Sequence, residues 1–217
     1  MARRTPGERD EAVPHDSAGL TGTKLQIAEA ALETLKSHGY AGASARAIAH
    51  TGGFNQALIF YHFGSVHNAL LAALDVISGR RLDAYAPAIK SARTASELGR
   101  LARRIYDEDL ERGYITALGE MVSGAIADAT LGAEVSARIE PWIAIVQDKL
   151  EQLLAGSALQ GLGSPADLAF GIVALYFGVD MLGHLQRDRA RAESLLDLAT
   201  RLATLAEAVL PHTQENR

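Results

Sequence analysis

The side chains best suited to chemistry in this sequence lie close together, between residues 44 and 65. Gln56 carries an amide that can pair bidentately with N6 and N7 of adenine. Ala57, next to it, allows a close approach or a contact with the methyl group of thymine. The Tyr61 hydroxyl and the His62 ring can donate hydrogen bonds to phosphates. Hydrogen bonding to base edges and phosphates is the chemistry of DNA recognition, and it requires an element that holds these groups on one face.

Residues for other kinds of chemistry are missing or badly spaced. The sequence contains no cysteine, which excludes disulfides, thiolate zinc sites and thiol redox sensing. It has no nucleophile elbow, no phosphate-cradling glycine loop and no pair of His residues on one helical turn. His62 and His67 are poorly spaced for a shared metal, and the run Asp107-Glu108-Asp109 is interpreted as a solvated face. We therefore expect no enzyme, no catalytic residue, no metal and no cofactor.

Two very short helices would have to position the DNA-recognition groups. Ser44 is a suitable N-cap for the first helix, and Gly52-Gly53 breaks it because glycine accepts a positive φ. Asn55 can cap a second helix from Gln56 to about His62, which Gly64 closes. Helices of this length must pack on something larger to be stable. Two short helices around a glycine turn are typical of a helix-turn-helix, whose second helix enters the major groove.

Residues 23–71 resemble the DNA-binding domain of the TetR family of bacterial regulators. The matching segments are Gly39-Tyr40, Ala47-Ile48-Ala49, Gly53-Phe54-Asn55 and, above all, Phe60-Tyr61-His62-Phe63-Gly64-Ser65. The resemblance implies a transcriptional regulator that contacts DNA through Ser44, Asn55, Gln56, Ala57, Phe60, Tyr61 and His62, and we add Arg46 from the first short helix. Three positions depart from the family pattern: Leu58 replaces a polar residue, Phe60 a frequent Tyr, and Val66 a phosphate-binding Lys.

Composition and charge agree with a cytosolic regulator. Residues 1–20 are polar and contain no apolar stretch typical of a secretory signal, so we expect a flexible arm and a cytoplasmic protein without a membrane span. The net charge is −5, and residues 1–63 hold six basic and six acidic side chains. The remaining residues hold 15 basic and 20 acidic side chains. A neutral N-terminal part on an acidic body predicts weak non-specific DNA affinity and recognition by geometry.

The whole chain is predicted to be all-α, with about nine or ten helices. We expect a three-helix DNA-binding domain at residues 21–66, a helical effector-binding and dimerisation domain at 67–211, and a flexible tail at 212–217. The first helix should end before Gly39, and Ser65 should cap a long helix that Pro87 ends or bends. Ser96 is predicted to cap the next helix. A long helix from Leu131 to Leu154 should kink or break near Ile139, because Pro141 lies inside it.

The last two helices are predicted to form a homodimer interface. Ser164-Pro165 is a typical helix start, and the following residues 168–179 are apolar all round, so this helix should be buried on several sides. The last helix carries two adjacent apolar stripes and therefore needs partners on two sides. The predicted interface residues are Gly171, Ala174, Gly178, Leu195, Leu198, Leu202 and Leu205.

Several apolar and aromatic residues of the second domain could line a cavity for a small effector. The candidates are Tyr114, Met121, Trp142, Phe170, Tyr176, Phe177 and Asp180. Asp180 interrupts an apolar stretch, so it must be exposed, paired with Arg187 or another arginine, or used in ligand binding. The lining favours a mainly hydrophobic ligand.

Together these features predict a one-component transcriptional regulator. It would bind double-stranded DNA at a palindromic operator as a dimer, act as a repressor, and be released by its ligand. One alternative is a small all-α enzyme, which would need Glu-x-x-His pairs that the sequence lacks. The other is a helical protein-interaction module that has lost DNA binding, in line with Val66 and the acidic balance.

Overall fold

The computed structural model describes residues 20–156, 163–186 and 189–207, and the regular structure in these ranges is entirely helical. The helices are α1 (Gly22–Gly42), α2 (Ala45–Gly52), α3 (Ala57–Phe63), α4 (Val66–Ser91), α5 (Ala95–Glu111), α6 (Tyr114–Ala125), α7 (Ala129–Leu154), α8 (Pro165–Gln186) and α9 (Arg189–Glu207). The predicted all-α class is confirmed. The predicted tail, and the predicted arm apart from residue 20, lie outside the described residues.

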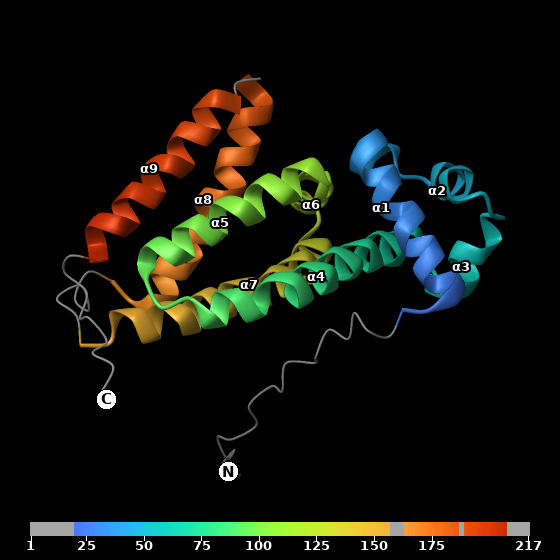
Figure 1. Ribbon diagram of the computed structural model, residues 1–217. Coiled ribbons are helices and arrows are strands. Elements are labelled where there is room, and N and C mark those ends of the chain that lie inside the picture. The colour runs from blue at the N-terminus through green and yellow to red at the C-terminus, as the bar shows by residue number, and fades with distance from the viewer. Residues whose placement is uncertain (1–19, 157–162, 187–188, 208–217) are drawn as a thin grey trace, which may run out of the picture.

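Helices α1–α3 form a head at one end of the molecule, and α4–α9 form the body (Figure 1). The long helix α4 begins next to α3 in the head and runs along the body, where α7 lies beside it. Helices α8 and α9 lie side by side on the far part of the body and also pack against α7 and α5 respectively. The head is therefore attached to the body through one continuous helix, α4, and through packing of α1 on α4 and α6.

The head is held together by the buried face of α1. Ile27 and Leu35 are fully buried, and they share one apolar cluster with Ile48 of α2 and Ile59 of α3. At the edge of this cluster Thr34 Oγ1 donates to the carbonyl of Ala30 at 2.7 Å and lies 3.1 Å from Thr51 Oγ1. The short helices thus depend on α1 for their stability, as their length requires.

Helix α1 bends near its end, at the position where the sequence predicts it to stop. Gly39 has φ 69° and interrupts the helical backbone, after which the chain stays helical to Gly42. Glu120 of α6 accepts a hydrogen bond from the Tyr40 N–H at 2.8 Å. A side chain at residue 39 would collide with the Glu120 carboxylate, so the left-handed glycine is required for this contact.

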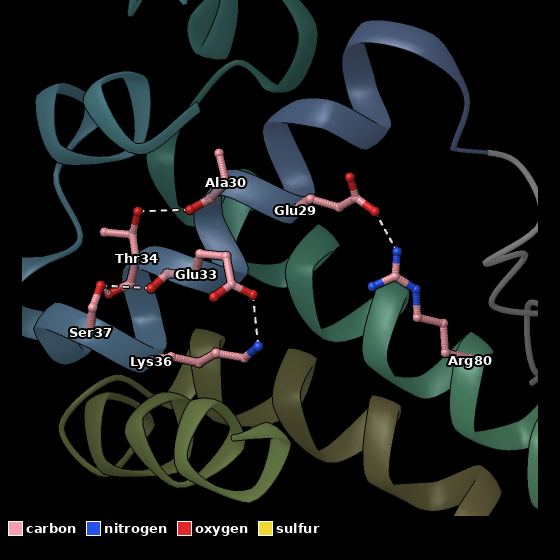
Figure 2. A network of polar contacts seen from close by, with 7 residues as sticks. All are labelled: Glu29, Ala30, Glu33, Thr34, Lys36, Ser37 and Arg80. Carbon is pink, nitrogen blue, oxygen red and sulfur yellow. Dashed lines mark hydrogen bonds and ion pairs between the residues drawn. The ribbon is translucent and has the colours of Figure 1, made fainter. Parts of the chain in front are cut away.

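Polar contacts lie on both faces of α1 (Figure 2). On the exposed face Lys36 and Ser37 donate to Glu33, and on the buried face Thr34 donates to Ala30. In the same view Arg80 of α4 reaches Glu29 of α1, with both side chains nearly half exposed. An exposed ion pair contributes only about 0–1 kcal/mol. The firmer attachment is apolar, since Ala28 of α1 packs on two buried residues of α4, Ala72 and Val76.

Two helix boundaries of the body differ from the sequence prediction. Thr94, and not Ser96, caps α5, because its side chain accepts the Glu97 N–H at 3.2 Å while Glu97 accepts the Arg93 N–H at 2.7 Å. This is close to a capping box, and Ser96 lies buried in the first turn. Helix α7 begins earlier than predicted, at Ala129, because Asp128 accepts two backbone N–H groups there.

Neither internal proline ends its helix. Pro87 lies inside α4, which continues to Ser91, and Pro141 lies inside α7, which runs without a break to Leu154. A proline removes one backbone hydrogen bond, and the surrounding helix contacts here are sufficient to keep both helices continuous. Of the two outcomes predicted near Ile139, the break is therefore wrong, and the kink stays a prediction.

Helix α8 begins as predicted, with Ser164 accepting the Asp167 N–H at 3.0 Å ahead of Pro165. Within one chain, however, it is not buried on several sides: Phe170 is 64% exposed, and Met181 and Leu182 are each 55% exposed. By length and composition alone, the stretch Pro165–Gly183 could cross a membrane.

Candidate DNA-reading surface and ligand cavity

Helix α3 is set into the head by one buried residue and by caps at both ends. Ile59 is fully buried against the head cluster. Asn55 Oδ1 accepts the Ala57 N–H at 2.9 Å, so Asn55 satisfies the first turn as predicted even though the regular helix begins at Ala57. Gly64, with φ 74°, ends the helix, and Asn68 donates to the last carbonyl, that of Phe63, at 2.7 Å.

The turn between α2 and α3 requires its two glycines for different reasons. Gly53 adopts φ 68° and ends α2 in the left-handed conformation. Gly52 is helical, but a Cβ there would come within 2.2 Å of the Phe54 ring and 2.8 Å of the Ala30 side chain. Residue 52 is thus kept small by the close packing of α1, α2 and the turn. The Gln26 amide adds a hydrogen bond to the Gly52 carbonyl at 3.3 Å.

The structure brings the predicted DNA-contacting residues together at the head. Tyr61 is 82% exposed and Phe60 is 51% exposed, and only His62 is half-buried, with its ring 4.9 Å from that of Tyr61. The other predicted contacts are exposed as well: Ser44, Arg46, Asn55, Gln56 and Ala57. These residues form the candidate DNA-reading surface, at the start of α2 and along the outer side of α3, and their contact with DNA stays a prediction.

Two of the three residues that depart from the family pattern face the interior of the head. Leu58 and Val66 are partly buried and pack against the head cluster. Leu58 therefore serves packing, and a phosphate anchor at the start of α4 is replaced by an apolar contact. Phosphate binding would have to come from exposed groups such as Arg46 and Tyr61.

A cavity of about 110 Å³ lies in the body between α4, α5, α7 and α8. Of the predicted ligand-binding residues, Trp142, Tyr176 and Phe177 line it. The other four do not line it. Tyr114 and Met121 are buried in the cluster shared with the head, Phe170 points outward, and Asp180 is buried elsewhere on α8. The burial of Asp180 excludes simple exposure, and a pair with Arg187 lies outside the described residues.

One wall of the cavity carries a buried ion pair that sequence reasoning missed. Arg81 of α4 lies 2.6 Å from Asp109 Oδ2 of α5, and the Tyr176 hydroxyl of α8 donates to the same oxygen at 2.5 Å. The Arg81 side chain also donates to the Tyr176 hydroxyl at 3.3 Å and lies 4.4 Å from the centre of the Trp142 ring. The three helices that surround this part of the cavity are therefore tied together by one polar cluster.

The interpretation of the acidic run 107–109 as a solvated face is wrong for Asp109, which is fully buried. Its position was detectable, because residues 98, 102, 105 and 109 follow helical spacing and place Asp109 on the buried stripe of α5. Arg81 likewise follows Leu74 and Ile77 on the buried stripe of α4.

Burial governs the ionisation of this cluster. Desolvation raises the pKa of Asp109, while the Arg81 charge and the Tyr176 hydrogen bond oppose that rise. Desolvation also raises the pKa of Tyr176 well above its ordinary value, so its hydroxyl stays protonated at neutral pH and acts as a donor.

Arg138 of α7 is the second arginine at the cavity. Its Nε and one terminal nitrogen hold both oxygens of Asp75 on α4, at 2.8 and 3.2 Å, and its other terminal nitrogen binds Glu134 at 2.9 Å. Such a bidentate pair fixes orientation as well as charge. Arg138 therefore ties α7 to α4. Its partner Asp75 lies nearer the head end of α4 than Arg81 does.

Comparison with known proteins agrees with this arrangement. Residues 27–74 match the family described as "Bacterial regulatory proteins, tetR family". No curated protein matches the chain at a significant level.

Among solved structures, a TetR-family regulator from Cytophaga hutchinsonii superposes with a TM-score of 0.72 at 15% identity, over 88% of this chain and 96% of that one. A putative TetR-family regulator from Rhodococcus sp. gives 0.69 at 21% identity, over 83% and 97%. The regulator FadR from Bacillus subtilis, in complex with stearoyl-CoA, gives 0.69 at 17% identity, over 81% and 97%. At these identities the structural matches establish the fold, whereas the sequence match covers the head and the start of α4. Residues 27–74 thus match the TetR family of bacterial regulatory proteins, and the chain shares its fold with solved TetR-family regulators.

Proposed function

We propose that this protein is a cytoplasmic repressor that binds a palindromic operator as a homodimer and is released by a small, mainly hydrophobic ligand. The observation that carries the proposal is the course of α4. This one helix begins beside the DNA-reading surface and supplies Arg81 and Ile77 to the wall of the cavity. Any change in the cavity that moves α4 also moves the head.

The dimer is supported by an apolar face on α8 and α9 that one chain leaves open. On α9, Leu198, Leu202 and Leu205 are 49%, 56% and 69% exposed, and on α8 Phe170 is 64% exposed. Side chains added at Gly171 or Gly178 would meet open space, so a second helix can approach there closely. Four such helices from two chains would bury this face around a two-fold axis. Covering by a second copy also accounts for the apolar character of Pro165–Gly183 without a membrane.

The ligand class is supported by the cavity walls, most of which are aliphatic or aromatic. The fold neighbour FadR from Bacillus subtilis was solved with stearoyl-CoA, a ligand with a long apolar chain. The cavity here, about 110 Å³, is far below the range of about 300–1,000 Å³ for sites that hold drug-sized ligands. It has room for a compound of about one ring, since an engineered cavity of about 150 Å³ binds benzene.

Release of the operator needs only a modest preference of the ligand for one conformation. A ligand that binds the non-DNA conformation about 100-fold better supplies about 2.7 kcal/mol of coupling. The same α4 contacts, from Asp75 to Arg138 and from Arg81 to Asp109, would carry this energy to the head.

The proposal is tested by selecting bound duplexes from a random pool and footprinting the winner. We expect an inverted repeat whose half-sites lie about one helical turn, or a multiple of it, apart. Leu202→Glu places a charge on the open α9 face and should give monomers in sedimentation and weak operator binding. Arg201→Glu, at an exposed neighbouring position, is the matched control for added charge. Enrichment of no duplex, or full operator binding by a monomeric Leu202→Glu protein, would contradict the proposal.

A further inference from the structure

We propose that the ligand of the cavity is a compact apolar acid, about the size of one substituted ring, whose carboxylate is bound by Arg81. This inference rests on the proposed function and specifies the chemistry of its ligand. It follows from the charges at the cavity wall, from the unequal pairing of two arginines, and from the size of the cavity.

The charges at the wall have one sign. Of the described residues that line the cavity, the charged ones are Arg81 and Arg138, and no acidic side chain is among them. Their carboxylate partners, Asp109 and Asp75, stand behind the lining. Two arginines and no carboxylate therefore line the cavity among the described residues. In surroundings that are otherwise apolar, this arrangement favours an anion and disfavours a cation.

The two arginines differ in how fully their donors are used. Arg138 is bidentate to Asp75 and also binds Glu134, so its guanidinium is engaged on both sides. Arg81 meets Asp109 through one terminal nitrogen and one carboxylate oxygen. Its Nε is buried and has no hydrogen-bond partner among the described residues, and the same holds for Asp109 Oδ1. A buried guanidinium with an unused donor is costly unless something else accepts from that donor.

The surroundings of Arg81 keep its guanidinium in place. Its side chain is 10% exposed, and its guanidinium carbon lies 4.4 Å from the Trp142 ring centre and 5.6 Å from that of Tyr176. Aromatic faces hold a guanidinium plane without using its N–H groups. The Nε of Arg81 therefore has no acceptor among the described residues, while one terminal nitrogen is shared between Asp109 and Tyr176, and a planar carboxylate matches the guanidinium fork. We assign Arg81 as the ligand anchor and Arg138 as a structural contact between α7 and α4.

The size of the cavity limits the rest of the molecule. About 110 Å³ accommodates a small ring and excludes a long acyl chain unless the helices separate. Sugars and other polyols fit poorly, because among the described lining residues only Ser78, Tyr176 and the Trp142 ring offer polar groups besides the arginines.

Three probes with the same apolar body test the assignment: 4-isopropylbenzoate, 4-isopropylbenzyl alcohol and 4-isopropylbenzylamine. Trp142 is the only tryptophan of the chain and lines the cavity, so its fluorescence reports binding, with calorimetry as a second measurement. We expect the acid to bind at least about tenfold more tightly than the alcohol, in line with a hydrogen-bonded charge, and the amine to bind most weakly.

The variant Arg81→Met/Asp109→Asn removes both members of the ion pair, so that no charge is left buried alone. It should weaken binding of the acid by about tenfold or more and change binding of the alcohol less than about threefold. Arg81→Lys keeps the charge but loses the fork, and should show an intermediate loss. The matched control is Arg80→Met, because Arg80 is the neighbouring residue but reaches out to Glu29 on α1.

Equal binding of acid and alcohol, an unchanged preference in the double variant, or no binding of any probe at millimolar concentration would overturn the assignment of Arg81. The selected operator duplex separates this result from a failure of the proposed function. If the alcohol releases the operator as well as the acid does, the regulator is ligand-released but Arg81 is not its anchor. If the ligand-free protein binds no duplex, the proposed function fails as well.

Discussion

Removing Arg81 alone should destabilise the protein strongly, because it leaves the carboxylate of Asp109 buried without its counter-charge. Asp109 is fully buried, its Oδ2 lies 2.6 Å from Arg81, and the Tyr176 hydroxyl donates to the same oxygen at 2.5 Å. Breaking a buried pair from one side costs about 3–5 kcal/mol. That is a large share of the total stability of a typical protein, about 5–15 kcal/mol.

The effect of the unpaired charge is separated from general damage to the core by comparing the single variant with a double variant. Arg81→Met should lower the free energy of unfolding by about 3–5 kcal/mol, whereas Arg81→Met/Asp109→Asn should cost much less, since an ion pair replaced as a whole is often nearly neutral. Urea denaturation followed by circular dichroism measures both, and it avoids Trp142, whose ring contacts Arg81.

The single variant should also change the pH dependence of stability. Burial raises the pKa of Asp109, and Arg81 opposes that rise in the wild type. Without Arg81, folded Asp109 holds a proton that the unfolded chain releases above about pH 4. The free energy of unfolding of Arg81→Met should therefore fall as pH rises from about 4 through the raised pKa of the folded state. If Arg81→Met were no less stable than the double variant at neutral pH, and showed no such slope, the account of the pair would be refuted.

Three further substitutions test the packing of the head, the cap of α5 and the pKa of Tyr85. Gly52→Ala brings a Cβ within 2.2 Å of the Phe54 ring and should destabilise the head by about 1–3 kcal/mol in thermal melts, whereas Gly119→Ala, where a Cβ meets nothing within 4 Å, should cost nothing. Thr94→Ala removes the cap of α5 and should lower the free energy of unfolding by about 1 kcal/mol, and an unchanged melt would argue against the cap. Burial and a hydrogen bond to Glu108 of α5 raise the pKa of Tyr85 from 10.0 to about 12. Above pH 10 the folded state therefore keeps a proton on Tyr85 that the unfolded state loses. Stability should therefore fall between pH 10 and about 12, and Tyr85→Phe should reduce that slope in alkaline denaturation.

The boundaries of the short helices and the start of α4 could be predicted from sequence, because they follow local rules. Ser44 and Ser65 cap α2 and α4, and Gly53 and Gly64 end α2 and α3 in the left-handed conformation, all as expected from residue type. Caps and glycine turns depend on a few neighbouring residues, so one sequence suffices to locate them. The role of Gly52 was less accessible, because it depends on contact with a residue of α1.

The structure of the body was harder to predict from sequence, because its features depend on contacts between distant segments. Pro87 and Pro141 are helix breakers by type, yet the packing of α4 and α7 keeps both inside continuous helices. Aspartate is a residue type that usually lies at the surface, and the burial of Asp109 is explained by its partner Arg81, 28 positions away. Helical spacing gave a signal for the position of each residue, but not for their pairing.

The cavity shows the same limit. Trp142, Tyr176 and Phe177 line it, whereas Tyr114 and Met121, which are equally apolar, belong to the cluster that joins the body to the head. Amphipathic spacing identifies a buried face but does not indicate which part of that face is filled by another side chain and which part borders a cavity. The assignment of ligand contacts among these residues stays a prediction until a ligand is bound.

The central claim, that α3 reads base sequence, is tested most directly by a base-resolved binding profile of the wild type and two variants on the selected operator and all its single-base changes. Gln56→Ala should lose about 1–3 kcal/mol on the operator and become tolerant at one base pair in each half-site. Tyr61→Phe removes the exposed hydroxyl, and should weaken binding to all duplexes alike and leave the preferences intact. An unchanged profile for Gln56→Ala, with the same affinity and the same preferred bases as the wild type, would contradict the claim.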